Sequence, residues 1–475
     1  MMTDFQNRVF DIFRQLNSIP RPSHHEEKVA DFLCSYARSL GLEYDRDPQN
    51  CVVIRKPASR GCEDADTLVL LNHMDMVAVG DGTRPFDPLS DGIEAYVEAG
   101  WMKARGSSLG ADNGIGLSMA LAVLADDTLI HGPLEVLTTT NEEDGMSGAA
   151  SMSSDFVKGR KVINLDSEDY DTITVGAAGA YLQTATFRLS QCHAPANAVF
   201  FEVRLGGGLG GHSGVDIGKG RANAIHTLAE LICASADSVS VASLDGGSAN
   251  ASIPSSCTAV IGVDSSQAPG FVTLMKAEFE KMRVRFSDGN GLTLDLLEAE
   301  STSSVIAGSE LLRLIVSLPC GVIRMHETLP GTVMTSNNIG IVSTDGASVR
   351  ISCHTRSFSD EEMVSTAESI GAQFEKAGAS VRVLMNTPGW QENPDSDFLK
   401  LTDSTFRDVL GFSPRKVAMH FVLEAGYYVR KFPGIQIACI GPRIVEPHST
   451  SERVELSTVY DICNVLVELL ARLAV

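Results

Sequence analysis

The chain has 475 residues, of which 44% are hydrophobic and 21% charged, and its formal net charge is −22. This length exceeds the roughly 250–300 residues at which a single core stops growing, so we expect two domains. The composition excludes a disordered chain, and the acidic balance disfavours nucleic acid as a partner because phosphate binding needs a basic surface.

Targeting signals and cysteine motifs are not evident in the sequence. The N-terminal stretch MMTDFQNRVF lacks the basic region and long apolar run of a secretion signal, and no segment reaches about 18 uninterrupted apolar residues. The ten cysteines are dispersed without a CxxC pair, which disfavours a zinc ribbon and a redox motif. We therefore expect a cytoplasmic protein that does not bind a membrane.

The N-terminal part of the chain predicts a helix followed by three strands with helical segments between them. The sequence Ser-His-His-Glu at 23–26 indicates a capping box, and apolar residues then recur at helical spacing as far as Gly41. Three short apolar runs predict the strands, at 67–72, 133–140 and 161–165. This β-α-β-α-β order favours a parallel sheet.

Each of these strands leads directly into residues that can bind a divalent metal. The candidates are His73 after the first strand, Glu142 and Glu143 after the second, and Asp166 after the third. A later apolar run at 434–440 precedes His448 in the same way, and a long apolar helix at 456–473 follows. Because ligands of open α/β sheets gather at the carboxyl ends of strands, we expect these side chains to lie close together.

The middle of the chain has a different pattern. Alternating strands such as 200–205 are mixed with helices such as 359–376, and no obvious metal ligand or clear internal repeat occurs there. Since the last candidate ligand lies beyond this stretch, we expect a domain inserted into another. The predicted fold is α/β, with a central, mostly parallel sheet in a domain at 1–182 and 387–475, and an inserted α+β domain at 183–386.

Two motifs place acids beside the candidate ligands. In the sequence His-Met-Asp at 73–75, side chains two residues apart share one side of an extended strand end, so Asp75 can hold the second ring nitrogen of His73. Asp112 lies in a glycine-rich bend at the start of a helix. It is either an N-cap residue or an acid that bridges two cations with one oxygen for each.

Glu142 and Glu143 are adjacent, just after a buried strand. A solvated acidic turn is the ordinary explanation. The alternative is that Glu143 binds a metal while Glu142 acts as the base, because a base must reach its proton without being a ligand itself. With His448, the candidates number two histidines and three carboxylates, which suit a pair of zinc or similar ions about 3.5–4 Å apart. Such a site indicates amide hydrolysis.

Other motifs argue against different chemistries. The glycine-rich stretch 206–211 satisfies GxGxxG, but more glycine follows in place of an apolar helix, which disfavours a dinucleotide site. The Gly-Lys-Gly at 218–220 lacks the remaining residues of a P-loop. A G-x-S-x-G nucleophile elbow is missing because position 215 is valine, so a serine hydrolase is disfavoured.

With these residues assembled, the chain resembles the M20 metallopeptidases, and within them the aminoacyl-histidine (Xaa-His) dipeptidases. Seven segments match in family order: NHMDMV from Asn72, SLGADNGIG from Ser108, TTNEEDGMSGA from Thr139, INLDSED from Ile163, GLGGHSGVDI from Gly208, HFVLEAG from His420 and GPRIVEPHSTSERV from Gly441. The resemblance implies a zinc-peptidase-like catalytic domain, an inserted lid domain and two Zn²⁺ ions, with Co²⁺ or Mn²⁺ as substitutes.

The resemblance also implies a role for each candidate in the catalytic domain. By this resemblance, Asp112 bridges two metal ions. His73 and Asp166 bind one of these ions, and Glu143 and His448 bind the other. Glu142 is the general base, and Asp75 is the acid that orients His73.

Four residues of the second part of the chain are implied to meet the substrate. His212 corresponds to the histidine that stabilises the oxyanion, although its glycine-rich surroundings alone indicate a surface residue. Arg356 corresponds to the arginine that pairs with a substrate carboxylate, with a surface arginine as the alternative. Glu424 is the candidate partner of the substrate amino group. Asn250 is displaced by one position from the family's asparagine.

The predicted function is hydrolysis of free dipeptides, with Xaa-His (carnosine-like) peptides as the expected substrates. A tripeptidase, an N-acyl-amino-acid deacylase and a non-catalytic metal-binding scaffold are the alternatives, and the presence of Glu142 beside five ligands argues against the scaffold. Because binding of a substrate between two domains excludes water, we expect the two domains to close on the substrate. The expected partner is a small peptide. A homodimer through the inserted domain is left open, as is whether His212 acts within its own subunit.

Overall fold

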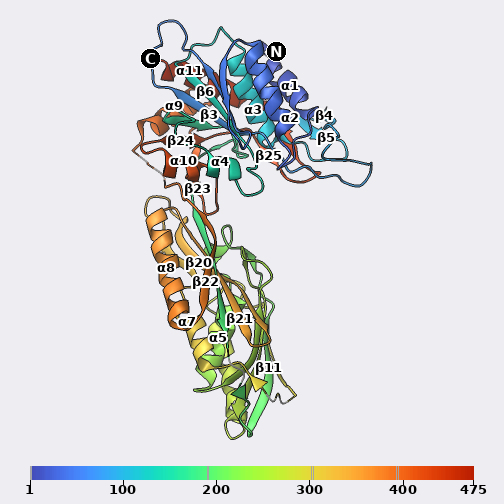
Figure 1. Ribbon diagram of the computed structural model, residues 1–475, viewed down its shortest axis with the longest axis vertical. Helices are drawn as coiled ribbons and strands as arrows, with labels where there is room; N and C mark the ends of the chain where they lie inside the picture. Colours follow the sequence, from blue (N-terminus) through green and yellow to red (C-terminus); the bar gives the residue numbers. More distant parts are fainter. Residues whose placement is uncertain (1–2, 190–191, 301, 303, 392, 394) are drawn as a thin grey trace. The chain divides into compact units, whose positions relative to one another are not determined.

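The computed structural model describes residues 3–189, 192–300, 302, 304–391, 393 and 395–475. The chain forms two compact units (Figure 1). Unit 1 consists of Met1–Val175, Glu392–Val417 and Tyr427–Val475, and unit 2 of Gly176–Gln391 and Ala418–Gly426. We expected a first domain of 1–182 and 387–475, whereas residues 176–182, 387–391 and 418–426 pack with unit 2. The chain therefore leaves unit 1 twice and returns to it twice.

Unit 1 is built on a sheet of eight strands among the residues described, in the order β1-β2-β6-β3-β7-β24-β8-β23. The bounds are β1 (Glu43–Arg46), β2 (Val52–Lys56), β3 (Leu68–His73), β6 (Leu134–Thr139), β7 (Lys161–Asn164), β8 (Thr172–Ala177), β23 (Arg415–Met419) and β24 (Gln436–Cys439). The four central strands, β6, β3, β7 and β24, run parallel. The predicted parallel core is confirmed, and antiparallel strands flank it.

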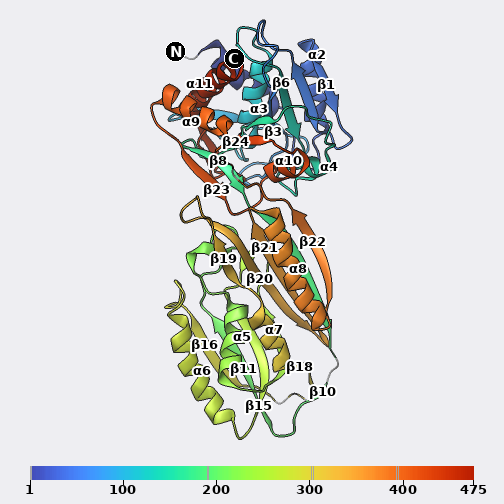
Figure 2. The same ribbon diagram turned by 90° about the vertical axis from the view of Figure 1, so that its left-hand side faces the viewer.

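Helices cover this sheet and share one apolar core with it (Figures 1 and 2). They are α1 (Asp4–Asn17), α2 (Glu27–Ser39), α3 (Ala111–Leu124), α9 (Asp397–Leu410) and α11 (Leu456–Leu473). Every residue of β3 and β6 is buried, as expected for strands covered on both faces. The remaining elements are α4 (Ser147–Ser151), α10 (Ala425–Lys431) and a small sheet of β4 (Ala95–Glu98), β5 (Trp101–Ala104), β26 (Arg453–Glu455) and β25 (Ile444–Val445).

The predicted capping box at 23–26 is wrong. Helix α2 has Glu26 at its N-cap position, with no hydrogen bond from a capping side chain. The Ser23 hydroxyl instead donates to Oδ2 of Asp75 at 2.8 Å, and Oε1 of Glu26 accepts the backbone N–H of Asn141 at 2.9 Å. Residues that match a local helix signature are therefore used to hold loops at the carboxyl edge of the sheet.

Unit 2 contains a ten-stranded sheet in the described part of the chain, with eight strands along the path β16-β11-β15-β13-β20-β21-β9-β22. The bounds are β9 (Gly179–Arg188), β11 (Ala198–Gly206), β13 (Ser240–Gly246), β15 (Cys257–Asp264), β16 (Thr293–Glu298), β20 (Val333–Asp345), β21 (Ser348–Ser357) and β22 (Ser380–Thr387), with β18 (Ala307–Gly308) beside β13 and β19 (Gly321–Met325) beside β20. Two short ribbons pair β10 (Cys192–His193) with β17 (Ser304–Val305), and β12 (Gly211–His212) with β14 (Ser252–Ile253).

The strand order of unit 2 contains the same β-α-β-β-α-β module twice. One module is β11-α5-β13-β15-α6-β16 and the other is β9-α7-β20-β21-α8-β22; in both, the fourth, first, third and second strands are neighbours in that order. The first module is inserted between β9 and α7 of the second, and β13 and β20 join them. The sequence shows no clear repeat, because each module requires apolar residues at certain positions and not particular residue types. Different side chains fill these positions in the two modules.

The helices of unit 2 are α5 (Ala224–Ser235), α6 (Ala268–Arg283), α7 (Ser309–Ser317) and α8 (Asp360–Lys376), and the short helix η1 is Ile217–Lys219. The four α-helices share one apolar core with the sheet and lie on the same side of it (Figure 2). Ile351 and Cys353 of β21 belong to that core. Because side chains alternate along a strand, Ser352, His354 and Arg356 project from the opposite face.

Within the described residues, none of the helices combines the length and hydropathy required to cross a membrane.

Candidate metal centre and catalytic residues

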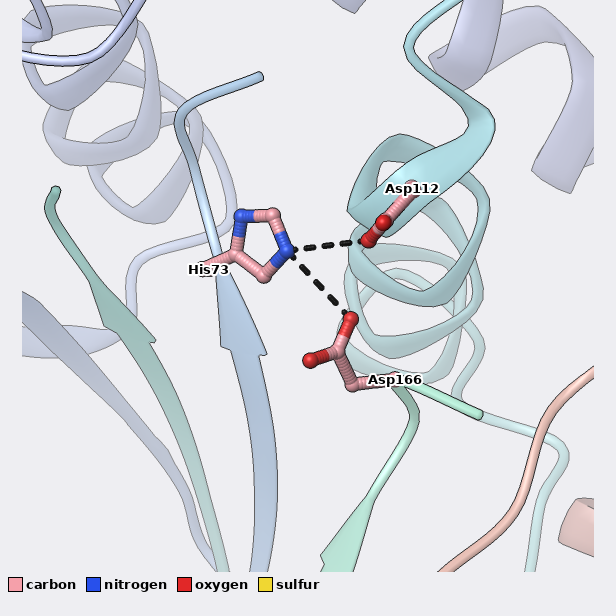
Figure 3. A group of neighbouring side chains, drawn as sticks. All are labelled: His73, Asp112 and Asp166. Carbon is pink, nitrogen blue, oxygen red and sulfur yellow. Dashed lines mark hydrogen bonds and ion pairs between the residues drawn. The ribbon is translucent and has the colours of Figure 1, made fainter. Parts of the chain in front are cut away.

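The structure brings the five predicted metal ligands together in unit 1, in two groups that share Asp112. The first group is His73, Asp112 and Asp166 (Figure 3), and the second is Asp112, Glu143 and His448. Within each group the candidate ligand atoms all lie within 4.8 Å of one another. Segments from both ends of the chain thus converge on one small volume.

The parallel strands explain how four of these residues meet. His73 ends β3, Glu143 follows β6, Asp166 follows β7, and His448 follows β24. Neighbouring parallel strands end at the same edge of the sheet, so the loops that follow them lie side by side.

Asp112 reaches the same edge from the first turn of α3. The N-cap position of α3 is Gly110 in the left-handed conformation (φ 67°), and it makes no side-chain capping hydrogen bond. Asp112 itself has non-helical dihedral angles (φ −81°, ψ 114°). The N-cap explanation for Asp112 is therefore wrong, and its carboxylate is directed at two histidines instead.

The two oxygens of Asp112 face different partners. Oδ1 lies 3.0 Å from Nε2 of His73, and Oδ2 lies 3.1 Å from Nε2 of His448. His73 Nε2 is also 3.3 Å from Oδ1 of Asp166 (Figure 3), while His448 Nε2 is 2.8 Å from Oε2 of Glu143. One oxygen toward each group is the arrangement that a bridging carboxylate requires.

The charges of this cluster fit divalent cations. Hydrogen bonds to Asp112 and Glu143 raise the pKa of His448 to about 11. Burial lowers the pKa of His73, but the charge of Asp166 and the hydrogen bonds to Asp112 and Asp166 outweigh it and hold this pKa well above its usual value. Both shifts show that the acids around these imidazoles favour positive charge there, which divalent cations would supply.

The donor set also fits. Imidazole nitrogens and carboxylate oxygens are the ligands that Zn²⁺ binds in catalytic sites. Oε1 of Glu143 is buried and has no hydrogen-bond partner among the residues that are described. Burying a carboxylate oxygen without a partner costs free energy. A cation between Glu143 and its neighbours would satisfy it.

Asp75 organises the loops behind the ligands. Its carboxylate accepts the backbone N–H groups of Glu142 at 3.1 Å and Glu143 at 3.2 Å. The Nδ1 atom of His73 lies 3.1 Å from the backbone oxygen of Asp75 and 3.4 Å from its Oδ1. Asp75 therefore contacts the second nitrogen of His73, as expected, and also fixes the turn that carries the two glutamates.

The turn after β6 is not a uniformly solvated acidic turn. The side chain of Glu143 is 5% exposed, that of Glu142 is half-buried, and only Asp144 is largely exposed, where it pairs with His24 at 2.8 Å. The three adjacent acids thus have three different environments, and Glu142 is intermediate in exposure.

Arg356 is buried in unit 2, so the surface alternative is wrong. It is 3% exposed, its Nε donates to the hydroxyl of Ser213 at 3.4 Å, and burial lowers its pKa to about 10. Nη1 has no hydrogen-bond partner in the described part of the chain. A buried guanidinium without a carboxylate partner is suited to bind an anionic group of a ligand.

His212 is exposed but has a defined orientation. Its Nδ1 accepts the backbone N–H groups of Gly214 at 3.2 Å and Val215 at 3.3 Å. In a neutral ring the proton must then reside on Nε2, which becomes a donor. Burial and the positive charge of Arg356 lower the pKa of His212 and favour this neutral form.

The other two predicted substrate-binding residues have different surroundings. Glu424 is 1% exposed, within the segment 418–426 of unit 2. Asn250 lies between β13 and β14 and lines a cavity of about 380 Å³ together with Arg350 and Arg382. Its side-chain oxygen is buried and has no hydrogen-bond partner among the described residues.

Two buried histidines near Arg356 were missed in the sequence. His354 lies two residues before Arg356 on the same strand face, and Nε2 of His420 is 2.8 Å from the hydroxyl of Ser336. Burial and the charge of Arg356 lower the pKa of each histidine to about 3. The His-x-Arg spacing in a strand is a signal for His354. His420 begins the matching segment HFVLEAG, but that match assigns no role to it.

Comparisons with known proteins agree with this site. The model of peptidase family M20/M25/M40 matches residues 69–472. The chain is 35% identical over 472 residues to the cytosol non-specific dipeptidase of Escherichia coli strain K12, covering 97% of this chain and 96% of that protein. It is similar to the crystal structure of aminoacylhistidine dipeptidase from Vibrio alginolyticus, with a TM-score of 0.93, 30% identity and coverage of 99% and 97%. Aminopeptidase PepT from Bacillus cereus shares the fold, with a TM-score of 0.60 and 16% identity over 100% of both chains. The predicted M20 metallopeptidase family is confirmed, and the chain belongs to peptidase family M20/M25/M40.

Proposed function

We propose that the protein is a two-metal dipeptidase that hydrolyses free dipeptides, with Xaa-His peptides as its substrates and Zn²⁺ as its metal, for which Co²⁺ or Mn²⁺ can substitute. The strongest support is the position of Asp112, whose two oxygens face His73 and His448. A dipeptidase activity also agrees with the names of the Escherichia coli and Vibrio alginolyticus proteins.

In the proposed mechanism, the metals activate the substrate and the water, and Glu142 transfers the proton. When bound, the two cations polarise the scissile carbonyl and lower the pKa of the attacking water toward neutrality. Glu142 takes a proton from this water as its oxygen adds to the carbonyl carbon. Glu142 then passes the proton to the leaving nitrogen as the C–N bond breaks. Asp75 keeps the carboxylate of Glu142 in place by holding the backbone of its turn.

Residues of unit 2 are proposed to bind the ends of the substrate and its oxyanion. Arg356 pairs with the free carboxylate, because a buried guanidinium needs an anion. Glu424 binds the amino group, His212 donates from Nε2 to the oxyanion, and Asn250 supplies a further polar contact.

His212→Ala is expected to lower kcat by about 10²–10³-fold, because one donor to an oxyanion is lost. Metal content should not change. His326→Ala is the matched control, since Nδ1 of His326 also accepts two backbone N–H groups, from Thr328 and Leu329. Steady-state kinetics and metal analysis of both variants test the assignment. Equal kcat values for His212→Ala and the parent protein would refute it.

Arg356→Lys is expected to lower kcat/KM for free dipeptides by about 10–100-fold, mainly through KM, since hydrogen bonds to charged groups contribute roughly 1.5–3 kcal/mol. Dipeptide amides, which lack the carboxylate, should be hydrolysed equally slowly by the parent protein and the variant. Arg324→Lys on β19 is the control, because the guanidinium of Arg324 already pairs with the carboxylate of Glu362. A loss that persists with the amides would contradict carboxylate binding.

Substrate class is tested by a panel of carnosine, other dipeptides, a tripeptide and N-acyl amino acids, assayed with Zn²⁺, Co²⁺ and Mn²⁺. We expect dipeptides to be preferred, with Xaa-His peptides first. A tripeptide or an N-acyl amino acid as the best substrate would replace the proposal with another M20 activity. Metal binding without any hydrolysis would indicate a scaffold.

The proposed location is the cytoplasm, which agrees with the name of the Escherichia coli relative and with the burial of Cys34, Cys51, Cys257, Cys353, Cys439 and Cys463. We propose small peptides as the binding partners, and neither nucleic acid nor membranes. The homodimer considered for the inserted domain stays a prediction, which light scattering of the purified protein tests.

A further inference from the structure

Glu452 is a buried acid that lies beside the metal centre and is not one of its candidate ligands. It is 3% exposed and follows His448 by four residues. Its carboxylate accepts the backbone N–H groups of the loop 109–112, which includes the first two residues of α3. The distances are 2.7 Å from Leu109, 2.8 Å from Gly110, 2.7 Å from Ala111 and 3.3 Å from Asp112. The segment that carries His448 is thus tied to the backbone of Asp112.

Arg21 holds the same loop through its carbonyl groups. It is 1% exposed, and its Nη2 donates to the carbonyl oxygen of Gly110 at 2.6 Å. Its Nη1 donates to the carbonyl oxygens of Met74 at 3.1 Å and Asp75 at 3.0 Å. The guanidinium therefore links the end of β3, where His73 lies, to the loop of Asp112.

The backbone is packed closely around this guanidinium. A Cβ atom placed on Gly110 would lie 2.7 Å from Nη2 of Arg21, and one on Gly114 would lie 2.5 Å from it. Both distances are too short for a side chain to be added without displacing Arg21. The glycines of the Gly-Ala-Asp-Asn-Gly segment are therefore required by Arg21 as well as by the turn.

Arg21 and Glu452 carry opposite charges in the same buried region. In the described part of the chain, no carboxylate lies within ion-pair distance of Arg21 and no cationic side chain within that distance of Glu452, so both bind backbone groups of one loop. Burial lowers the pKa of Arg21, and the negative charge of Glu452 opposes this shift more than those of Asp75, Asp112 and Glu143 do. The two residues thus act on the loop as a unit.

We propose that Arg21 and Glu452 are positioning residues that fix three ligand-bearing segments, 73–75, 109–112 and 448–452, so that the two oxygens of Asp112 face separate cations. This inference rests on the proposed two-metal site. It assigns no contact with substrate or metal to either residue. Their effect is on the geometry, and hence the affinity, of the metal centre.

Unit 1 offers a matched control in Glu135. This buried acid of β6 also accepts two backbone N–H groups, from Lys158 at 2.8 Å and Gly159 at 2.9 Å. Nε of Arg55 lies 3.2 Å from its Oε1. It lies near the start of β6, whereas the metal centre is beyond the end of that strand. Glu135→Gln therefore reports the cost of disturbing a buried acid away from the metals.

The test compares Glu452→Gln, Arg21→Lys and Glu135→Gln with the parent protein. Zn²⁺ affinity is measured by competition with a chromophoric chelator, and the visible spectrum of the Co²⁺-loaded protein reports ligand geometry. We expect the first two variants to bind Zn²⁺ about 10–100-fold more weakly and to show an altered Co²⁺ spectrum. Glu135→Gln should keep the parent's affinity and spectrum, even with a lower melting temperature.

The outcomes are distinguishable. If the parent protein binds two ions and folded Glu452→Gln binds them with equal affinity and an unchanged spectrum, the positioning role is refuted while the proposed function stands. Equal weakening in Glu135→Gln also refutes it. If Glu452→Gln fails to fold, Arg21→Lys decides by the same two measurements. A parent protein that does not bind two ions refutes both proposals.

Discussion

Glu142→Gln is expected to lower kcat by about 10²–10⁴-fold, the usual contribution of a general base, while the protein keeps its bound metal. Glutamine has nearly the same shape as glutamate but cannot take a proton from water near neutral pH. The backbone N–H of residue 142 would still donate to Asp75, so the turn should be retained. Glu143 and the other candidate ligands are unchanged, which is why metal content should stay near that of the parent protein.

The neighbouring acid provides the control for this variant. Asp144 is in the same turn, but it is largely exposed and pairs with His24. Asp144→Asn removes one negative charge at almost the same place, and we expect its activity to be close to that of the parent protein. Single-turnover kinetics and metal analysis of both variants make the comparison. An active Glu142→Gln protein would refute the base assignment, and equal losses in both variants would indicate a general effect of charge.

The parallel core of unit 1 was predictable because its signals are local. An apolar run that is buried on both faces leaves few alternatives to a central strand, and the runs at 67–72, 133–140 and 161–165 became β3, β6 and β7 within one or two residues. The helix expected at 456–473 has those bounds as α11, since an amphipathic stretch of that length specifies one helical face.

Other features of the fold depend on contacts between residues far apart in the chain. Ser23 and Glu26 have the spacing of a capping box, yet their side chains bind Asp75 and the N–H of Asn141. A local pattern cannot reveal that a distant group will compete for the same side chain. The packing of residues 418–426 with unit 2 is likewise set by tertiary contacts.

The candidate site could be found from the sequence because its ligands follow strands. The position of a residue after a buried strand fixes the edge of the sheet at which it lies, so His73, Glu143 and Asp166 were predictable as neighbours. Asp112 was ambiguous, because an N-cap and a bridging acid have the same sequence pattern. The left-handed Gly110, which takes the N-cap position itself, resolves the ambiguity.

The roles of Glu452 and Arg21 beside the metal centre could not be predicted from sequence patterns. Glu452 accepts N–H groups from residues about 340 positions earlier in the chain, and a single acid after a histidine motif carries no sign of such partners. Among the described residues, the hydrogen-bond partners of Arg21 are all carbonyl oxygens. Every residue has backbone N–H or C=O groups, so the sequence does not indicate which of them will bind a given side chain.

Asp112→Asn is expected to reduce bound metal from two ions toward none, whereas Asp166→Asn and Glu143→Gln should each lose mainly one ion. The reason is geometric. Oδ1 and Oδ2 of Asp112 face different histidines, so a neutral amide with one remaining oxygen weakens both groups. Asp166 contacts only His73 among the two histidines, and Glu143 contacts only His448, so each of these substitutions should weaken one group alone.

Metal-to-protein ratios after gel filtration in buffer of fixed free Zn²⁺ concentration separate these cases, because all three variants should be inactive and activity cannot distinguish them. Thermal unfolding gives an independent measure. A bound ion stabilises the folded state by about 2.7 kcal/mol at a free concentration of 100 times its Kd, so Asp112→Asn should lose the whole metal-dependent rise in melting temperature and the other two only part of it. If Asp112→Asn retained one tightly bound ion while Asp166→Asn lost both, the bridge would lie at Asp166 and the assignment of the two groups would have to be exchanged.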